Sequence, residues 1–184
     1  MAVRERVCSG CDLLWFNLII HLPHSLRPCS ASDPHPGNIL LVREGDGSPA
    51  IGLIDYGQVK RLPKQRRHSF AKLIIALDED NRDEIFRCTK ELGLRTKNMN
   101  PEIFYLWSKV SFDQDNHQIL GGKHVQLFME DLEARDPVQS LPRDLLMVSR
   151  ASILLRGLGH ALHQNRSVAK AWRPIAERVL REDI

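Results

Sequence analysis

Residues 33–58 read DPHPGNILLVREGDGSPAIGLIDYGQ, and this stretch decides the fold. It contains two short apolar runs, 39–42 and 51–54, separated by a turn segment rich in Gly, Asp, Ser and Pro. Short β-branched or leucine-rich runs joined by turn residues are typical of a β-hairpin. Because hairpin strands run antiparallel, this one brings Asn38, just before its first strand, close to Asp55, just after its second.

The residues at this end of the hairpin have the chemistry of a magnesium–nucleotide site. Magnesium prefers hard oxygen ligands and is usually held by one or two protein groups plus substrate phosphates. Protein kinases use a catalytic Asp, an Asn five residues later, and the Asp of an Asp-Phe-Gly turn. Asp33 and Asn38 have that spacing, and Asp55-Tyr56-Gly57 differs from the third element by one aromatic substitution. The sequence therefore predicts a magnesium–nucleotide site built from Asp33, Asn38 and Asp55.

The DPHPGN loop, the hairpin and the LIDYGQ segment together resemble the catalytic core of the UbiB/ADCK (aarF-domain) atypical kinases. The resemblance extends from about Ala31 to the C-terminus, and its specific motifs lie within 33–58. It implies a protein-kinase-like C-terminal lobe that binds ATP and magnesium, and a link to lipid quinone (coenzyme Q-type) metabolism. It also implies a location in mitochondria or plastids, with the cytoplasm as the alternative.

The resemblance assigns roles to the loop residues of what would be an ATPase or a small-molecule phosphotransferase. Asp33 is the catalytic residue, which positions or deprotonates the attacking hydroxyl or water, while Asn38 and Asp55 hold magnesium and the nucleotide. His35 matches the family's loop pattern and is placed with the cofactor-binding residues. It either braces the loop by hydrogen bonding or is a partly exposed loop histidine. Ala31 stands where kinase-like proteins usually carry a histidine.

Composition is that of an ordinary globular protein. The chain has 184 residues, 42% of them hydrophobic and 27% charged, which is enough for one compact domain. A net charge of +3 is too small to indicate nucleic-acid binding by itself, and four cysteines are too few for a disulfide scaffold. No apolar run approaches the roughly 20 residues that a transmembrane helix requires.

Residues 1–32 differ in character from the rest of the chain. They combine an early basic pair, a short apolar stretch at 13–20 and a proline-rich end. This pattern is compatible with an organellar presequence or with a misassigned start of the gene model. We therefore divide the chain into a divergent N-terminal segment, 1–32, and a kinase-like C-lobe, 33–184.

A basic run, 60–68, follows the Asp-Tyr-Gly turn. Such a run usually forms a solvated helix start, and that is the first interpretation. The second is an anionic surface partner, either phosphate or acidic lipid headgroups. That partner would be bound through Lys60, Lys64, Arg66 and Arg67. Nucleic acid is not expected, because no aromatic residues interleave with the basic ones.

The remainder of the chain is predicted to be helical. The first helix has an apolar stripe at i, i+3, i+4 and i+7, made of Phe70, Leu73, Ile74 and Leu77. Further helices are predicted at 85–92, from Asn100-Pro101, over 125–134, after Pro142 and after a Ser167 cap, with a loop at 112–122. Gly157 and Gly159 inside a helical pattern predict close packing or a kink. The fold class is therefore α+β, mainly α, with one β-hairpin.

Several kinase elements are not found in these 184 residues. There is no Gly-rich phosphate loop, no strand lysine of the N-lobe kind and no Ala-Pro-Glu segment. The sequence thus predicts a C-lobe whose N-lobe is missing, and leaves its status as an enzyme open. The chief alternative is a non-catalytic, pseudokinase-like binding or scaffold module, or a truncated product. A third is a peripheral membrane protein. The sequence predicts no oligomeric state.

Overall fold

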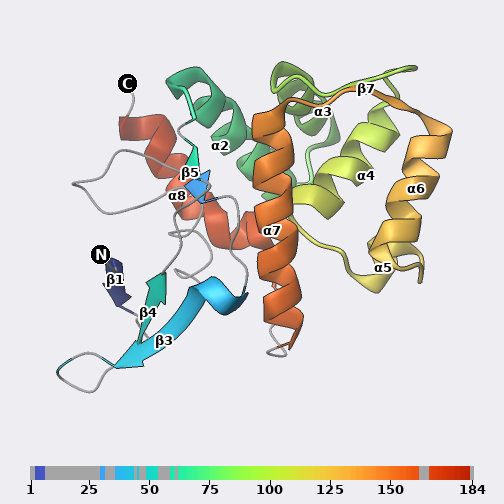
Figure 1. Cartoon of the computed structure of the whole chain (residues 1–184). Helices are drawn as coiled ribbons and strands as arrows, with labels where there is room; N and C mark the ends of the chain where they lie inside the picture. Colours follow the sequence, from blue (N-terminus) through green and yellow to red (C-terminus); the bar gives the residue numbers. More distant parts are fainter. Residues whose placement is uncertain are drawn as a thin grey trace.

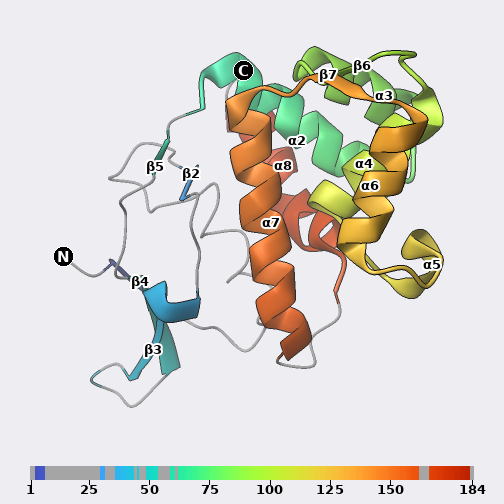
Figure 2. The same cartoon turned by 45° about the vertical axis from the view of Figure 1, so that its right-hand side comes forward.

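A computed structural model describes residues 3–6, 30–31, 36–43, 45, 49–53, 59–60, 62–161 and 166–182. The helices gather into one body and the main hairpin lies beside it, as two views show (Figures 1 and 2). The predicted fold class, α+β and mainly α, is confirmed. The elements in the first third of the chain are β1 (Val3–Arg6), β2 (Ser30–Ala31), the 3-10 turn η1 (Pro36–Asn38), β3 (Ile39–Arg43), β4 (Pro49–Leu53) and β5 (Val59–Lys60). They are followed by α2 (Lys64–Asp78), α3 (Arg82–Glu91), β6 (Arg95–Thr96), α4 (Pro101–Phe112), α5 (His117–Leu120), α6 (Val125–Arg135), β7 (Val138–Ser140), α7 (Arg143–Ala161) and α8 (Val168–Glu182).

The predicted hairpin is confirmed as the antiparallel pair β3–β4. Its register runs from Ile39 opposite Leu53 to Arg43 opposite Pro49. A third strand was not predicted: β1 pairs antiparallel with the other edge of β4, giving the order β1-β4-β3. β1 lies within the segment that the sequence set apart as divergent. Four residues alternating around charges are too short a pattern to identify as a strand without its partner.

The core of the helical body forms where α2 and α8 lie against each other (Figure 1). The predicted stripe of α2 is buried there, with no member more than 2% exposed. From α8 the fully buried Trp172 joins the same core, and from α4 Phe112 packs edge-on against Phe70 at 5.7 Å between ring centroids. Burial of this stripe contributes to the hydrophobic driving force for folding of the helical body.

Side-chain caps fix two of the predicted helix starts. Asn100 accepts a hydrogen bond from the backbone N–H of Glu102 at 2.9 Å, and Pro101 follows as the first residue of α4. Ser167 Oγ accepts from the backbone N–H of Lys170 at 3.0 Å. Each cap satisfies an N–H group that lacks a partner within its helix. Both predicted starts are confirmed.

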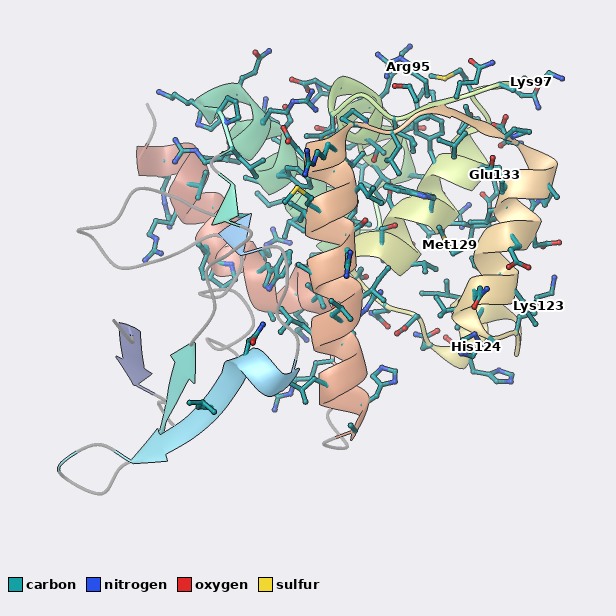
Figure 3. All side chains as sticks on the ribbon, in the orientation of Figure 1. Arg95, Lys97, Lys123, His124, Met129 and Glu133 are labelled. Atoms are coloured by element: carbon teal, nitrogen blue, oxygen red, sulfur yellow. The ribbon has the colours of Figure 1, made fainter. Side chains whose placement is uncertain are left out.

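Three details differ from the predictions. The loop expected over 112–122 contains the short helix α5. The segment after the basic run, predicted as helices with a loop at 112–122, also contains the strand pair β6–β7. Figure 3 shows Arg95 and Lys97 near that strand pair, at the opposite end of α6 from Lys123 and His124. Close packing or a kink was predicted at Gly157 and Gly159. Gly157 is exposed and would have nothing within 4 Å of an added Cβ, so it is not closely packed, whereas Gly159 is buried. The kink stays a prediction.

Among the described helices, none has the length and apolar character needed to span a bilayer.

Candidate functional site

Of the four residues predicted to form the nucleotide site, the structure describes Asn38. It ends η1, directly precedes β3 and is half-buried. Because Ile39 pairs with Leu53, Asn38 stands at the end of the hairpin where β4 finishes. Asp33, His35 and Asp55 lie outside the described residues. Their meeting with Asn38 therefore stays a prediction, although the hairpin on which it depends is present.

The first residue of β3 attaches this end of the hairpin to the helical body. Ile39 is partly buried and packs against the main hydrophobic core, whereas its neighbour Leu40 is 43% exposed. Successive strand residues point to opposite faces, so the alternation is what a half-covered strand requires. Asn38 is thus held one residue from an apolar anchor, and its backbone is positioned by the packing of Ile39.

A second candidate site is a pocket of about 430 Å³ on the helical body. Ligand pockets commonly have volumes of a few hundred Å³. This one lies where the loop after α4, the start of α5, the end of α7 and the approach to α8 meet. Its lining side chains are all polar: Gln114, Asp115, Asn116, His117, His160 and Arg166. The described part of the chain contains no cluster of three or more His, Cys, Asp or Glu suited to a metal.

A buried arginine lies behind the pocket. Arg156 of α7 is 2% exposed, and its Nη2 donates to the carbonyl of Val110. Its Nε is 3.9 Å from Oδ1 of Asp115, and Nε2 of His160 is 3.5 Å from the same oxygen. Burial lowers the pKa of the Arg156 guanidinium, and the carboxylates of Asp115 and Asp113 only partly offset that effect. The Asp115 side chain, which lines the pocket, therefore also faces the buried Arg156 guanidinium.

Asp113 has a different role, because its bonds all serve packing. This carboxylate is 1% exposed and accepts from Lys109 Nζ at 3.1 Å, from Ser167 Oγ at 2.5 Å and from the backbone N–H of Ala169 at 3.2 Å. Burial opposes the charge on Lys109, but Asp113 and the nearby Asp80 outweigh it and raise the pKa of the ammonium group. Asp113 thus ties the end of α4 to the start of α8. The i, i+4 spacing of Lys109 and Asp113 was its one signal in the sequence.

The described residues of the basic run differ in exposure. Lys64 is exposed at the start of α2, as a solvated helix start requires. Arg66 is half-buried, and its Nη1 donates to the carbonyl of Leu92 at the end of α3. At least one arginine of the run therefore stabilises the helical body.

The sequence matches a family model over the predicted nucleotide site and is similar to curated proteins over most of its length. Residues 27–89 match the family model described as the ABC1 atypical kinase-like domain. Among curated proteins, the chain is 25% identical over 152 residues to an AarF domain-containing kinase 1 of Drosophila melanogaster, covering 77% of this chain and 29% of that protein. It is 26% identical over 148 residues to an AarF domain-containing protein kinase 1 of Gallus gallus, covering 74% and 28%. The chain thus spans less than a third of the length of these relatives. No solved structure matches.

Proposed function

The chain belongs to the ABC1 atypical kinase-like family through its match over 27–89, and from that premise we propose that it provides the magnesium-binding half of a nucleotide site. Asn38 and Asp55 hold magnesium with ATP, Asp33 positions or deprotonates the attacking hydroxyl or water, and His35 braces the loop. The observation that carries the proposal is the hairpin register. Ile39 opposite Leu53 puts Asn38 at the end from which the chain continues to Asp55.

These residue types fit the cofactor that the family implies. Carboxylate and carboxamide oxygens are the hard ligands that magnesium prefers. When bound, magnesium neutralises the charge that develops on the phosphates during phosphoryl transfer. The chain's own contribution is to hold two ligands on a rigid ribbon and to place an acidic side chain beside the nucleophile. Rigid placement matters because phosphoryl transfer depends mainly on positioning and on electrostatic stabilisation.

The proposal predicts weak, magnesium-dependent binding. With no Gly-rich loop or strand lysine in these residues, the triphosphate is held mainly through the metal. We expect an affinity of about millimolar, roughly −4 kcal/mol, and no ATP turnover above background. The test is titration of the purified 184-residue chain with a fluorescent nucleotide, with and without magnesium.

Matched variants make this titration specific. Asp55→Asn and Asn38→Ala should each abolish the magnesium-dependent component while leaving the helical circular-dichroism signal unchanged. Asp83→Asn and Gln139→Ala are the controls, because both residues are exposed on the helical body. If Asp55→Asn binds as the parent chain does, the proposed site is wrong. Micromolar binding with ATP hydrolysis that Asp33→Asn abolishes would instead make this chain an enzyme on its own.

Three finer features of the proposal rest on the resemblance and on the basic run. We expect the protein to act in lipid quinone metabolism in mitochondria or plastids, and to contact an acidic membrane surface through Lys60 and Lys64. A soluble ubiquinone analogue should then change the nucleotide affinity. Salt-sensitive binding to anionic vesicles should be reduced by Lys60→Glu with Lys64→Glu. The matched pair Lys97→Glu with Lys170→Glu should have no effect.

A further inference from the structure

The pocket on the helical body, lined by Gln114, Asp115, Asn116, His117, His160 and Arg166, lies outside the family-matched residues 27–89. We propose that it binds a small neutral molecule rich in hydroxyl groups, a monosaccharide or a cyclic polyol, through the carboxylate of Asp115. The proposal does not depend on the magnesium–nucleotide site. Arg166 has an interaction of its own within the chain and takes no part in the proposal. Three observations support it: the acceptor capacity of Asp115, the balance of charge around it and the fixed orientation of the neighbouring polar side chains.

Asp115 is the first observation, because its carboxylate faces the pocket with acceptor capacity to spare. Its side chain is 18% exposed. Among the described residues, Arg156 Nε at 3.9 Å and His160 Nε2 at 3.5 Å pair with Oδ1, both farther away than a usual N–H···O bond of roughly 2.9–3.0 Å. A carboxylate accepts about four hydrogen bonds. Adjacent hydroxyl groups of a polyol supply such donors, as a ribose hydroxyl does to an Asp or Glu in dinucleotide-binding folds.

The balance of charge is the second observation, and it favours a neutral ligand. The guanidinium of Arg156, which is 2% exposed, lies behind Asp115 and offsets its charge. Asp113, the other carboxylate near this guanidinium, shares Lys109 with Asp80. An anion in the pocket would meet the carboxylate of Asp115, and a cation would be repelled by the guanidinium. Hydroxyl groups donate hydrogen bonds without adding a charge beside either group.

The neighbouring polar side chains are the third observation, because contacts within the chain determine which atoms remain for a ligand. Asn116 Oδ1 accepts from the backbone N–H of Ile119 at 3.0 Å, and its Nδ2 donates to Gln114 Oε1 at 2.8 Å. The Nε2 group of Gln114 therefore remains as a donor. The His117 ring lies beside Gly122, where an added Cβ would be 3.2 Å from its Nε2. These contacts orient the lining before a ligand arrives, which reduces the ordering cost of binding.

The test uses the full chain in EDTA without magnesium or nucleotide, so that the proposed nucleotide site cannot contribute. Ribose, glucose and myo-inositol are the hydroxyl-rich probes. Dioxane, a neutral ring with oxygen acceptors but no hydroxyl groups, is the control. Binding is followed by NMR of the imidazole C–H signals of His117 and His160, with His124, which precedes α6, as the internal reference (Figure 3). We expect saturable shifts of both signals with at least one hydroxyl-rich probe at up to about 50 mM, a range that covers a Kd of about 1 mM, and none with dioxane.

Two variants distinguish recognition from general damage. Asp115→Asn should weaken binding of the hydroxyl-rich probe about tenfold, because a charged acceptor is replaced by a neutral one. Asp83→Asn, which changes an exposed carboxylate on α3, should leave the affinity unchanged. His160→Trp keeps Asp115 in place and fills the pocket with an indole ring, so it should abolish the shift of His117. Arg150→Trp, on the exposed face of α7, should not.

Three results would overturn the proposal. The first is the absence of saturation with every hydroxyl-rich probe. The second is a variant, Asp115→Asn or His160→Trp, that is folded by circular dichroism and binds as the parent chain does. The third is a stronger response to phosphate or to tetramethylammonium than to every polyol, which would assign the pocket to an anion or a cation. If Asp115→Asn does not fold, His160→Trp decides alone.

Discussion

The helical body and the hairpin end use polar side chains in opposite ways. In the body, the carboxylates of Asp113 and Asp136 are 1% exposed, and each accepts three hydrogen bonds from the protein. At the hairpin end, Asn38 is half-exposed and directly precedes β3, whose first residue, Ile39, packs against the core. A charge that is fully enclosed and fully bonded serves the fold, because it has no remaining capacity for a ligand.

Asp136 shows how complete that enclosure is. Its carboxylate accepts from Thr96 Oγ1 at 2.6 Å and from the backbone N–H groups of Asn98 and Asn100 at 2.7 and 3.0 Å. These bonds fix the loop that leads into α4, next to the β6–β7 pair. At the hairpin end, the described Ile39 packs against the main hydrophobic core. The comparison predicts that substitutions in the body change stability, and that substitutions at the hairpin end change binding.

The largest effect is expected from Asp113→Ala. This change removes the buried one of the two carboxylates that pair with the Lys109 ammonium, leaving only the exposed Asp80, and removes the acceptor at the start of α8. Breaking a buried pair in this way costs about 3–5 kcal/mol. The free energy of unfolding in urea measures it, with the exposed Asp83→Ala as the control at under about 0.5 kcal/mol. A loss as small as the control's would mean that Asp113 is not structural.

Asp136→Asn should cost somewhat less, about 2–3 kcal/mol, because hydrogen bonds to a charged acceptor are lost while the shape is kept. In the variant, the amide N–H₂ group of the new asparagine faces backbone N–H donors and cannot accept their hydrogen bonds. Urea unfolding measures this effect too, and nucleotide binding should be unchanged once the variant is folded. A selective loss of binding would contradict the division between body and hairpin.

Asp136 also makes the stability of the fold depend on pH. Burial opposes ionisation of Asp136, but its bonds from Thr96, Asn100 and Asn98 outweigh burial and lower its pKa. A lowered pKa in the folded state means that its stabilisation is present above the unfolded value, about 3.9, and is lost as the pH falls through the folded value. Between pH 5 and 3, where the unfolded-state carboxyl begins to bind protons, the parent chain should lose stability more steeply than Asp136→Asn. Parallel curves would show that another carboxylate dominates acid unfolding.

Ile39→Ala tests the hairpin side of the comparison. Because Ile39 is only partly buried, we expect a cost of about 1–2 kcal/mol, below the range for fully buried isoleucine. Its effect on magnesium-dependent nucleotide binding should be proportionally larger, since Asn38 loses its anchor. Leu40→Ala, on the exposed face of the same strand, is the matched control. Equal effects of the two changes on binding would refute the anchoring role.

The smallest expected effect is an increase in stability. Gly157→Ala replaces an exposed residue near the C-terminal end of α7, where an added Cβ meets nothing within 4 Å. Alanine loses less backbone entropy on folding, so the variant should be about 0.5–1 kcal/mol more stable. Thermal unfolding measures this gain. A loss of stability would mean that α7 needs flexibility at that position.

Local patterns predicted the elements whose signals are local. The hairpin followed from turn chemistry between two apolar runs, the stripe of α2 from helical spacing, and the starts of α4 and α8 from Asn100-Pro101 and Ser167. Longer-range features left no such signal. Asp136 contacts a residue 40 positions away, and the bond between Asp113 and Ser167 spans 54.

Of the two candidate sites, one could be predicted from local sequence patterns and the other could not. Asp33, Asn38 and Asp55 were predicted from kinase-like spacing, because five residues on one loop and two ends of one hairpin are local relations. The pocket on the helical body could not be predicted, since three separate segments of the chain, at 114–117, 160 and 166, meet to form it. Arg156 resembles an exposed helical arginine when taken alone. Its burial becomes visible only because Ser152 and Gly159, at i−4 and i+3, lie on the same buried face of α7.

The packing of α8 along α2 has a consequence for synthesis on the ribosome. The ion pair between Asp78 and Arg173 joins residues 95 positions apart, at the contact between the two helices. At roughly 5–20 residues per second, translation leaves the apolar stripe of α2 without its partner helix for about 5–20 seconds. Throughout that interval the nascent chain exposes an apolar surface that contains Phe70, Leu73 and Leu77. Chaperones that bind emerging apolar segments would bind the chain at this surface.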